Sequence, residues 1–268
     1  MPTDTPDTPS LLGDVRVVIL AGGRGARLAP LTSVLPKPLM PIGDRAIIEL
    51  LVSRLVAAGA QKLTLCVGYL SHLIRAVLND GSKHGIEIGY VTENVPLGTA
   101  APLRLVPDLD KTFLVMNGDV LTTLDFAELV AAHRAAGNTI TIATHSRRVR
   151  IDYGVLHHSE DADGHRRLTS FDEKPELPVT VSMGIYVLEP RALDFIPEMG
   201  YFDFPHLVEA LLAAGEPVGV HVYEGLWYDI GRREDYEEAA RAWEDAHPTP
   251  SAQLVPQEDT RELEDLAS

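Results

Sequence analysis

The chain has 268 residues, of which 45% are hydrophobic, and its formal net charge is −16 at pH 7. A chain of this length and apolar content buries the core of one large domain, or of one domain with an added lobe. The negative charge argues against nucleic acids and anionic membranes as partners, because basic surfaces bind both. An anionic substrate would therefore need a local group of cations.

Both ends of the chain are predicted to be disordered tails. Residues 1–13 and the acidic segment 248–268 are polar and lack apolar periodicity, which leaves residues 14–247 as the folded domain. The N-terminal segment lacks the basic region of a signal peptide, and no apolar run approaches the roughly 20 residues of a membrane-spanning helix. The single cysteine, Cys66, lies in an apolar run and leaves no internal disulfide. These features predict a cytoplasmic protein with Cys66 in its core.

Short apolar runs alternate with helical patterns through the first 145 residues. The predicted strands are Val15–Leu20, Lys62–Val67, Ile86–Val91, Thr112–Met116 and Ile140–Ala143. The predicted helices are about Arg45–Ala58, Leu70–Leu78, Thr99–Leu105 and a helix from the N-cap Asp125 to Ala136. Buried strands that alternate with crossover helices are typical of a mostly parallel sheet with helices on both faces, in a Rossmann-like α/β fold.

After residue 145 the pattern changes to strands with little helix between them. These strands are Tyr153–His157, Arg167–Phe171 and Val179–Leu188. They predict an antiparallel lobe added to the sheet. Helices return at Phe204–Ala213 and Arg233–Ala246.

The strongest local motif is Leu20-Ala21-Gly22-Gly23-Arg24-Gly25-Ala26-Arg27-Leu28, directly after the first predicted strand. Ligands of α/β sheets bind at the carboxyl ends of strands, and glycines there let backbone N–H groups approach a phosphate. The two arginines add fork-shaped donors that a plain turn would not need. No Gly-Lys-Ser or Gly-Lys-Thr of a P-loop occurs in the chain, and the dinucleotide fingerprint fails because Leu28 replaces its last glycine.

A lysine between two prolines follows this loop, in Pro36-Lys37-Pro38-Leu39-Met40-Pro41. Prolines stiffen the segment, so the ammonium group of Lys37 has little conformational freedom to lose. Alone, such a lysine is an ordinary loop residue. Behind a loop that binds phosphate, it is a candidate for the next phosphate ligand.

In this order of motifs the chain resembles the sugar-1-phosphate nucleotidyltransferases. The further blocks are Pro96-Leu97-Gly98-Thr99-Ala100, Asn117-Gly118-Asp119, Tyr153-Gly154, Glu173-Lys174-Pro175, Met183-Gly184-Ile185-Tyr186 and Trp227-Tyr228-Asp229-Ile230-Gly231. The resemblance covers about residues 15–240 and is closest to the mannose-1-phosphate guanylyltransferase branch, which includes relatives that act on heptose phosphates. The left-handed β-helix of many long members is not expected, because too few residues follow residue 240.

The resemblance implies transfer of a nucleoside monophosphate from a nucleoside triphosphate to a sugar 1-phosphate, with release of pyrophosphate. It places nucleotide binding in about residues 14–145 and sugar binding in about residues 146–232. The implied nucleotide-binding residues are Leu20, Gly22, Gly23, Gly25, Arg27, Glu93, Gly98 and Thr99. The implied sugar-binding residues are Gly118, Gly154, Glu173, Lys174, Ser182 and Gly184. The implied catalytic residues are Arg27, Lys37, Asp119, Lys174 and Asp229.

Each implied catalytic residue has a chemical reason. Arg27 would neutralise the departing pyrophosphate, Lys37 would bridge the α-phosphate and the sugar phosphate, and Lys174 would hold the sugar phosphate. Asp119 ends a buried strand, where a carboxylate is costly without a cation, so it is a candidate ligand for Mg²⁺ or Mn²⁺. A structural aspartate in a turn is the alternative. Asp229, in an expected turn, would be the second metal ligand, although the sequence does not show that it meets Asp119.

The base and the sugar are less well defined. The carboxylate of Glu93 can only accept hydrogen bonds, which suits the two adjacent donors of guanine and favours GTP. The alternative interpretation is that Glu93 is an ordinary exposed glutamate of a loop, without a role in binding the base. Ala26, Gly118 and Ser182 depart from common residues of the family, and Ser182 puts mannose in doubt. Thymidylyl, uridylyl or adenylyl transfer and a non-catalytic regulatory homologue remain alternatives, and a nicotinamide oxidoreductase is disfavoured by the broken fingerprint. A homodimer or larger homo-oligomer stays open.

Overall fold

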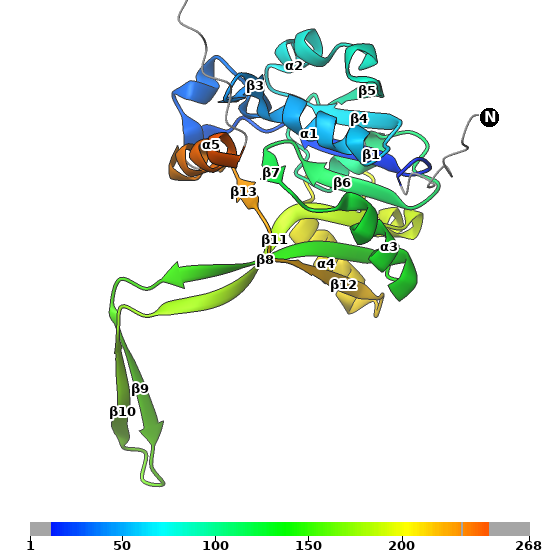
Figure 1. The fold of residues 1–268 in the computed structure, drawn as a ribbon. Coiled ribbons are helices and arrows are strands. Elements are labelled where there is room, and N and C mark those ends of the chain that lie inside the picture. Colours follow the sequence, from blue (N-terminus) through cyan, green and yellow to red (C-terminus); the bar gives the residue numbers. More distant parts are fainter. Residues whose placement is uncertain (1–11, 232, 247–268) are drawn as a thin grey trace, which may run out of the picture.

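A seven-stranded sheet forms the centre of the computed structural model, which describes residues 12–231 and 233–246 (Figure 1). The strand order is β12-β8-β11-β6-β1-β4-β5. These strands are β1 (Arg16–Ala21), β4 (Lys62–Val67), β5 (Glu87–Thr92), β6 (Phe113–Asn117), β8 (Ile140–Arg150), β11 (Glu176–Leu188) and β12 (Val218–Tyr223). β11 runs antiparallel to both of its neighbours, and the other neighbouring pairs are parallel. The expected mostly parallel sheet is therefore confirmed.

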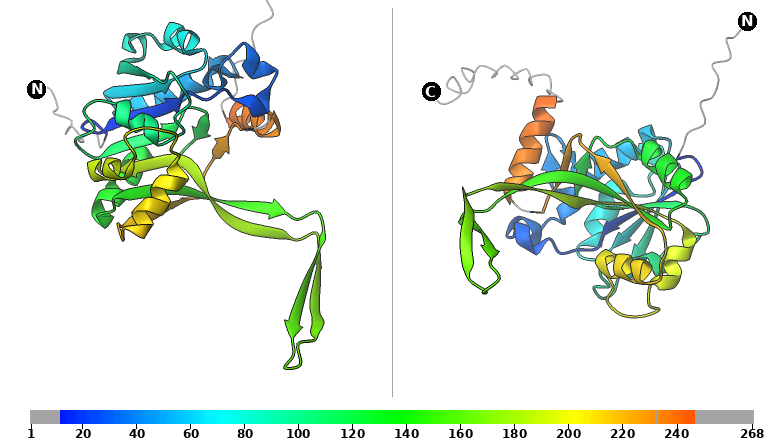
Figure 2. Two further views of the ribbon diagram at one scale, coloured as in Figure 1. Left: turned by 180° about the vertical axis from the view of Figure 1, so that it is seen from behind. Right: turned by 90° about the horizontal axis from the view of Figure 1, so that it is seen from below.

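Helices cover both faces of this sheet, because successive residues of a buried strand point to opposite sides. Val17 and Ile19 of β1 pack with α1 (Ile47–Ala57), α2 (Ser71–Leu78) and α3 (Phe126–Ala136). Val18 packs on the other side with α4 (Phe204–Ala213) and the short 3-10 helices η5 (Ala101–Leu105) and η6 (Pro190–Phe195). Figure 2 shows α3 and α4 on opposite sides of the sheet. Cys66 is buried in the second of these cores, as predicted.

The predicted helix after Asp125 shows why local signals work well in this chain. The side chain of Asp125 accepts hydrogen bonds from the backbone N–H groups of Ala127 (2.9 Å) and Glu128 (3.1 Å), which stabilises the start of α3. The helix ends at Gly137, whose φ of +63° is easy for glycine. The predicted helix at Thr99–Leu105 is present as the shorter η5.

The expected antiparallel lobe takes the form of a long arm, defined here as residues 147–179. It consists of the outer halves of β8 and β11 and of a hairpin made by β9 (Gly154–Glu160) and β10 (Arg166–Glu173). Figures 1 and 2 show the arm projecting from the sheet. Every residue of β10 is exposed, so the hairpin is held mainly by its own strand pairing.

Two small strand pairs lie beside the main sheet. β7 (Val120–Thr122) pairs with β13 (Trp227–Asp229), and β2 (Pro41–Ile42) pairs with β3 (Arg45–Ala46). The prediction of a turn at Asp229 is wrong, because this residue ends strand β13, which pairs with β7. A third core cluster joins Ile230 to Ile42 and to helix α5 (Arg233–Ala246). The C-terminal part of the domain thus packs against the segment that follows the glycine loop.

The remaining short helices connect these elements. They are η1 (Ala26–Leu28), η2 (Leu31–Ser33), η3 (Lys37–Leu39) and η4 (Ser82–His84). Leu12, which the sequence assigns to the N-terminal tail, is buried in the first core cluster. Residues 1–11 and 247–268, most of the predicted tails, lie outside the described residues. Within the described residues, no helix combines the length and the apolar character needed to cross a membrane.

Candidate active site

The glycine loop lies at the carboxyl end of β1, and two of its three glycines, Gly22 and Gly25, approach neighbouring side chains closely, whereas a Cβ atom on Gly23 would meet no other atom within 4 Å. A Cβ atom on Gly22 would lie 2.4 Å from Oε1 of Glu93. Gly25 has a φ of +61°, and a Cβ atom there would lie 2.9 Å from a methyl carbon of Thr32. The hydroxyl of Thr32 donates to the carbonyl oxygen of Gly25 at 2.8 Å. The loop backbone is therefore held at the end of the strand by close contacts.

A lysine and two aspartates from distant segments meet beside this loop. Lys37, at the start of η3, is buried and forms an ion pair with Oδ2 of Asp119. Its Nζ also lies 3.6 Å from Oδ1 of Asp229. The pairing of β7 with β13 sets Asp229 opposite Val120, and the N–H of Ile230 donates to the carbonyl oxygen of Asp119 at 3.2 Å. Strand pairing thus brings the two carboxylates to one place.

The charges around Asp119 and its unpaired oxygen favour another cation. Burial raises the pKa of Asp119, the ammonium of Lys37 lowers it, and the carboxylate of Asp229 raises it again. Oδ1 of Asp119 is buried and has no hydrogen-bond partner among the described residues. An unpaired buried carboxylate oxygen is costly, and two carboxylates are suitable ligands for a hard divalent cation. The residues present therefore fit a metal ion held by Asp119 and Asp229.

A continuous cleft runs along the glycine loop, because three adjoining cavities share Gly23. The first, of about 290 Å³, is lined by Arg27, Lys37 and Asp119 among others. Arg27 lies close to Asp229 as well, since a Cβ atom on Gly231 would be 3.4 Å from both Nη2 of Arg27 and Oδ2 of Asp229. Two cations of the cleft, Arg27 and Lys37, therefore lie at this end, whereas a third, Arg24, lines the cavity of about 460 Å³.

The second cavity, of about 330 Å³, contains the predicted nucleotide-binding residues beyond the loop. Its lining includes Leu20, Gly22, Gly23, Glu93, Gly98 and Thr99, together with Asp119. Oε2 of Glu93 accepts a hydrogen bond from the N–H of Leu97 at 3.3 Å. Burial raises the pKa of Glu93, and the bond from Leu97 partly offsets this effect. The third cavity, of about 460 Å³, lies on the other side of Glu93 and is lined by Arg24, Gly68 and Tyr69 among others.

Three of the predicted sugar-binding residues, Gly118, Ser182 and Gly184, lie in or directly beside the main sheet and not on the arm, but none of them lines the three cavities. Gly118 directly precedes Asp119, and a Cβ atom there would lie 3.1 Å from both a methyl carbon of Ile19 and the carbonyl oxygen of Leu20. Gly184 has a φ of +71°, and a Cβ atom on it would be 2.4 Å from Nδ2 of Asn117. The hydroxyl of Ser182 bonds to the N–H of Gly184 (3.2 Å) and to the hydroxyl of Tyr186 (3.1 Å).

The other predicted sugar-binding residues lie on the arm, and the structure does not bring them to the cleft. Glu173 ends β10, Gly154 begins β9, and Lys174 follows Glu173 with a φ of +48°. Nζ of Lys174 lies 3.9 Å from Oε1 of Glu173, and both side chains are exposed. A Cβ atom on Gly154 would lie 2.4 Å from the ring of Phe171, across the hairpin. Figure 1 shows these strands projecting away from β13 and β6.

The predicted site residues do not include four residues that line the second cavity: Pro96, Asn117, Tyr201 and Asp203. Pro96 stands in the Pro-Leu-Gly-Thr-Ala block of the resemblance. Asn117 stands in the Asn-Gly-Asp block and could have been found there. Tyr201 and Asp203 precede a predicted helix with no motif of their own, so only the folded chain brings them to the glycine loop.

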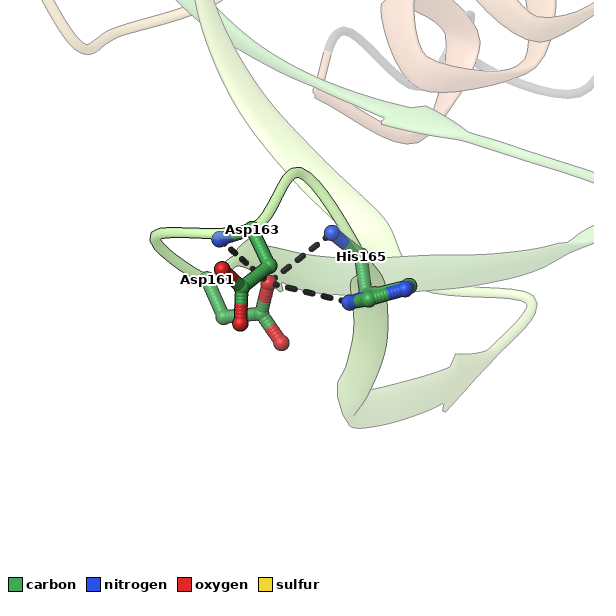
Figure 3. A group of neighbouring side chains, drawn as sticks. All are labelled: Asp161, Asp163 and His165. Atoms are coloured by element: carbon green, nitrogen blue, oxygen red, sulfur yellow. Dashed lines mark hydrogen bonds and ion pairs between the residues drawn. The ribbon is translucent and has the colours of Figure 1, made fainter.

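A second acidic group lies at the tip of the arm and has a structural explanation. Asp161, Asp163 and His165 gather there with exposed side chains (Figure 3). Oδ1 of Asp161 accepts hydrogen bonds from the backbone N–H groups of Asp163 (3.1 Å) and His165 (2.9 Å). The carboxylate of Asp161 therefore closes the hairpin turn, which accounts for the cluster.

Comparison with known proteins matches residues 16–246 to the family model described as "Nucleotidyl transferase". The chain is 32% identical over 251 residues to UTP–glucose-1-phosphate uridylyltransferase of Synechocystis sp., covering 85% of this chain and 63% of that protein. It is 35% identical over 230 residues to mannose-1-phosphate guanyltransferase of Yarrowia lipolytica, with coverage of 82% and 61%. The chain thus spans about three fifths of the length of these relatives.

Solved structures agree with the family match. HddC from Yersinia pseudotuberculosis superposes with a TM-score of 0.66 at 25% identity, covering 85% of this chain and 99% of that chain. The structure of HddC complexed with GMP-PN gives a TM-score of 0.64 at the same identity and coverage. The match along residues 16–246 confirms the family expected from the order of the motifs: this chain belongs to the nucleotidyl transferase family.

Proposed function

We propose that this protein transfers a nucleoside monophosphate from a nucleoside triphosphate to a sugar 1-phosphate, forming a nucleoside diphosphate sugar and pyrophosphate. The observation that carries this proposal is the meeting of Lys37, Asp119 and Asp229 beside the glycine loop. Two polyanions must approach each other in this reaction, so charge neutralisation and alignment are the main tasks of the protein. The names of the relatives support the same class of reaction.

In the proposed reaction, an oxygen of the sugar phosphate forms a bond to the α-phosphorus of the triphosphate. The bond from that phosphorus to the oxygen of the β-phosphate breaks, and its electron pair leaves with pyrophosphate. The attacking oxygen is already anionic, so no side chain has to remove a proton. None of the residues that line the three cavities is a histidine or a cysteine, which fits a reaction without a general base.

Each cation of the cleft has a proposed role. Lys37, held between two carboxylates, would bridge the α-phosphate and the sugar phosphate with its ammonium group. Arg27 lies in the same cavity and would neutralise the departing pyrophosphate. Backbone N–H groups of Gly22, Gly23 and Gly25 would contact the triphosphate.

Asp119 and Asp229 would hold Mg²⁺, with Mn²⁺ as an alternative. When bound, such an ion supplies positive charge to phosphate oxygens. The unpaired Oδ1 of Asp119 supports this assignment. Asp119→Asn should therefore lose more than nine tenths of the turnover, a barrier increase of at least about 1.4 kcal/mol. The exposed Asp110→Asn is a matched control that should keep wild-type turnover.

We propose GTP as the favoured donor and a mannose- or heptose-type 1-phosphate as the acceptor. Glu93 supports guanine, because a carboxylate accepts from both N1–H and the N2 amino group. Gly118, Ser182 and Gly184 would line the sugar side of the cleft. Glu173, Lys174 and Gly154, at the start of the β9–β10 hairpin, would take their proposed roles if the arm brings this part of the hairpin to the cleft when substrates bind.

Uridylyl transfer is the second candidate, since a relative of 32% identity carries that name. The test is a matrix of GTP, UTP, dTTP, ATP and CTP against mannose, glucose and heptose 1-phosphates, with pyrophosphate release as the readout. GTP should react fastest. A preference for UTP or dTTP would overturn the guanine assignment, and no release from any pair would overturn the proposed reaction.

The role of Glu93 has its own test in the same matrix. Hydrogen bonds to a charged group contribute roughly 1.5–3 kcal/mol, so Glu93→Gln should reduce the preference for GTP about tenfold or more. Glu87→Gln is the matched control, because Glu87 is exposed at the start of strand β5, which Glu93 directly follows. An unchanged preference in Glu93→Gln would remove this residue as the reader of the base. We also propose a cytoplasmic location, as the sequence predicts.

A further inference from the structure

Two loops that face the glycine loop are joined by a dense set of hydrogen bonds. The backbone N–H of Phe202 donates to the carbonyl oxygen of Leu97 at 2.8 Å. The N–H groups of Ala100 and Ala101 both donate to the carbonyl oxygen of Phe202 at 3.0 Å. Leu97 also donates to Glu93, so these bonds connect the proposed base reader to the segment before α4.

Tyr201 and Asp203 continue this network into the second cavity. Oδ1 of Asp203 accepts from both the N–H (2.8 Å) and the hydroxyl (3.0 Å) of Thr99. Oδ2 of Asp203 accepts from the hydroxyl of Tyr201 at 2.6 Å. A Cβ atom on Gly98 would lie 2.7 Å from the carbonyl oxygen of Phe202, so the close approach of the loops requires glycine there. Both oxygens of Asp203 are thus used to hold its neighbours.

The aromatic ring of Tyr201 remains available to a ligand. Tyr201 lines the cavity of about 330 Å³ and is 61% exposed. It is the one aromatic side chain among the described residues that line this cavity. Its hydroxyl is bonded to Asp203, so the orientation of the ring is fixed on one side. A ring held in this way is a ready surface for stacking.

We infer that Tyr201 provides an aromatic contact surface for the base of the bound nucleotide, and that Asp203 is a positioning residue that holds this ring and the loop of Glu93 together. The inference rests on the proposed function. Glu93 would read the edge of the base, whereas Tyr201 would contact its face. Stacking tolerates every base, so Tyr201 contributes affinity and Glu93 contributes preference.

The distribution of charge along the cleft supports this orientation of the nucleotide. Arg27 and Lys37 lie at one end with the candidate metal ligands, where a triphosphate is stabilised. Glu93 and Asp203 line the other cavity. Burial raises the pKa of Asp203, but hydrogen bonds from Tyr201 and Thr99 outweigh this effect and hold it below its usual range. Because ionised carboxylates repel phosphate, the uncharged base is the part of the nucleotide that suits this end.

The experiment compares nucleotide binding and turnover in four variants of the full chain. Calorimetric titration with GTP and Mg²⁺, without sugar phosphate, gives the dissociation constant, and steady-state kinetics give the KM values and kcat. Tyr201→Ala should weaken GTP binding by about 5- to 150-fold, the range expected for one base–aromatic stack. The KM for the sugar phosphate should change less than about twofold. Tyr153→Ala, an exposed tyrosine of the arm, is the matched control and should bind like wild type.

The other variants separate contact from positioning. Tyr201→Phe keeps the ring and should restore most of the affinity that Tyr201→Ala loses. Asp203→Asn should raise the KM for GTP while leaving kcat within about twofold of wild type. The loss in Tyr201→Ala should be similar for GTP and UTP, in contrast to the change of preference expected for Glu93→Gln. Thermal denaturation identifies any variant that fails to fold, in which case Tyr201→Phe and Asp203→Asn carry the test.

Several outcomes would overturn the inference. Wild-type binding of GTP by folded Tyr201→Ala would remove Tyr201 from the nucleotide site while leaving the proposed function intact. A rise confined to the KM for the sugar phosphate would move Tyr201 to the sugar side and would also overturn the inference. A wild-type protein that binds no nucleoside triphosphate would overturn the proposed function and the inference together.

Discussion

Replacing Lys37 by methionine tests the charge arrangement of the cleft most directly. Methionine keeps an unbranched side chain of similar reach, so Lys37→Met removes mainly the positive charge. The side chains of Lys37 and Asp119 are 10% and 20% exposed, whereas that of Asp229 is 42% exposed. Losing one partner of a buried ion pair costs about 3–5 kcal/mol, and a solvent-screened pair contributes less than about 1 kcal/mol. Because Asp119 keeps some solvent contact, we expect Lys37→Met to lower the free energy of unfolding by about 3 kcal/mol.

The same reasoning predicts that a divalent cation compensates for the lost lysine. In Lys37→Met, Mg²⁺ should neutralise Asp119 and Asp229, and a ligand at about 100 times its dissociation constant stabilises by about 2.7 kcal/mol. Denaturant unfolding in EDTA and in Mg²⁺ measures both quantities. The fold would then be rescued by Mg²⁺, but kcat should remain about 100-fold below wild type, because the ion does not replace the cation that faces the reacting phosphates.

The control for this variant is Lys62→Met, which breaks an exposed ion pair with Glu87. Such a pair contributes less than about 1 kcal/mol, and its loss should be insensitive to Mg²⁺. If Lys37→Met loses no more stability than Lys62→Met in EDTA, the fold does not depend on the charge of Lys37 to compensate the carboxylates of Asp119 and Asp229. If Mg²⁺ restores no stability, Asp119 and Asp229 do not form the metal site.

Three further predictions concern groups outside this cluster. Lys174→Ala should raise the KM for the sugar phosphate about tenfold or more, because it removes a hydrogen bond from a charged group, and kcat should stay within about twofold of wild type. An unchanged KM would mean that the arm does not reach the cleft. Burial lowers the pKa of His133, which the contact with Glu189 only partly opposes, so the unfolded chain takes up a proton first as the pH falls. The free energy of unfolding should therefore decrease below a pH of about 6.5, and an equal decrease in His133→Gln would contradict this. Burial raises the pKa of Cys66 to about 12, so a thiol reagent at pH 8 should label it only after denaturation, and rapid labelling of the native protein would refute its burial.

Local signals in the sequence determined most of the fold. The apolar run before the glycine loop became β1, because a strand buried on both faces has no polar alternation. Asp125 and Gly137 mark the two ends of α3, because capping depends on neighbouring residues alone. The sequence also identified the glycine loop and Lys37, since their spacing is short and each residue type has a direct chemical reason.

Contacts between segments that are distant in the sequence could be identified only from the tertiary structure. Asp229 was expected in a turn, but it reaches Asp119 because the three-residue strand β13 pairs with β7. Strands this short carry little pattern, and their pairing is stabilised only when the rest of the core places them together. The arm is a similar case: the sequence predicted its strands, but not the direction in which an exposed hairpin would extend.

The hydrogen bonds of Tyr201 and Asp203 show most clearly what the sequence predicts and what only the tertiary structure determines. Asp203 accepts a hydrogen bond from Thr99, from which it is separated by 104 positions in the sequence. No motif near either residue predicts this contact. Sequence patterns report the local conformation and the burial of each element, because these depend on neighbouring residues. The identity of the side chains that share a cleft depends on how whole elements pack, so only the folded chain determined which residues face the glycine loop.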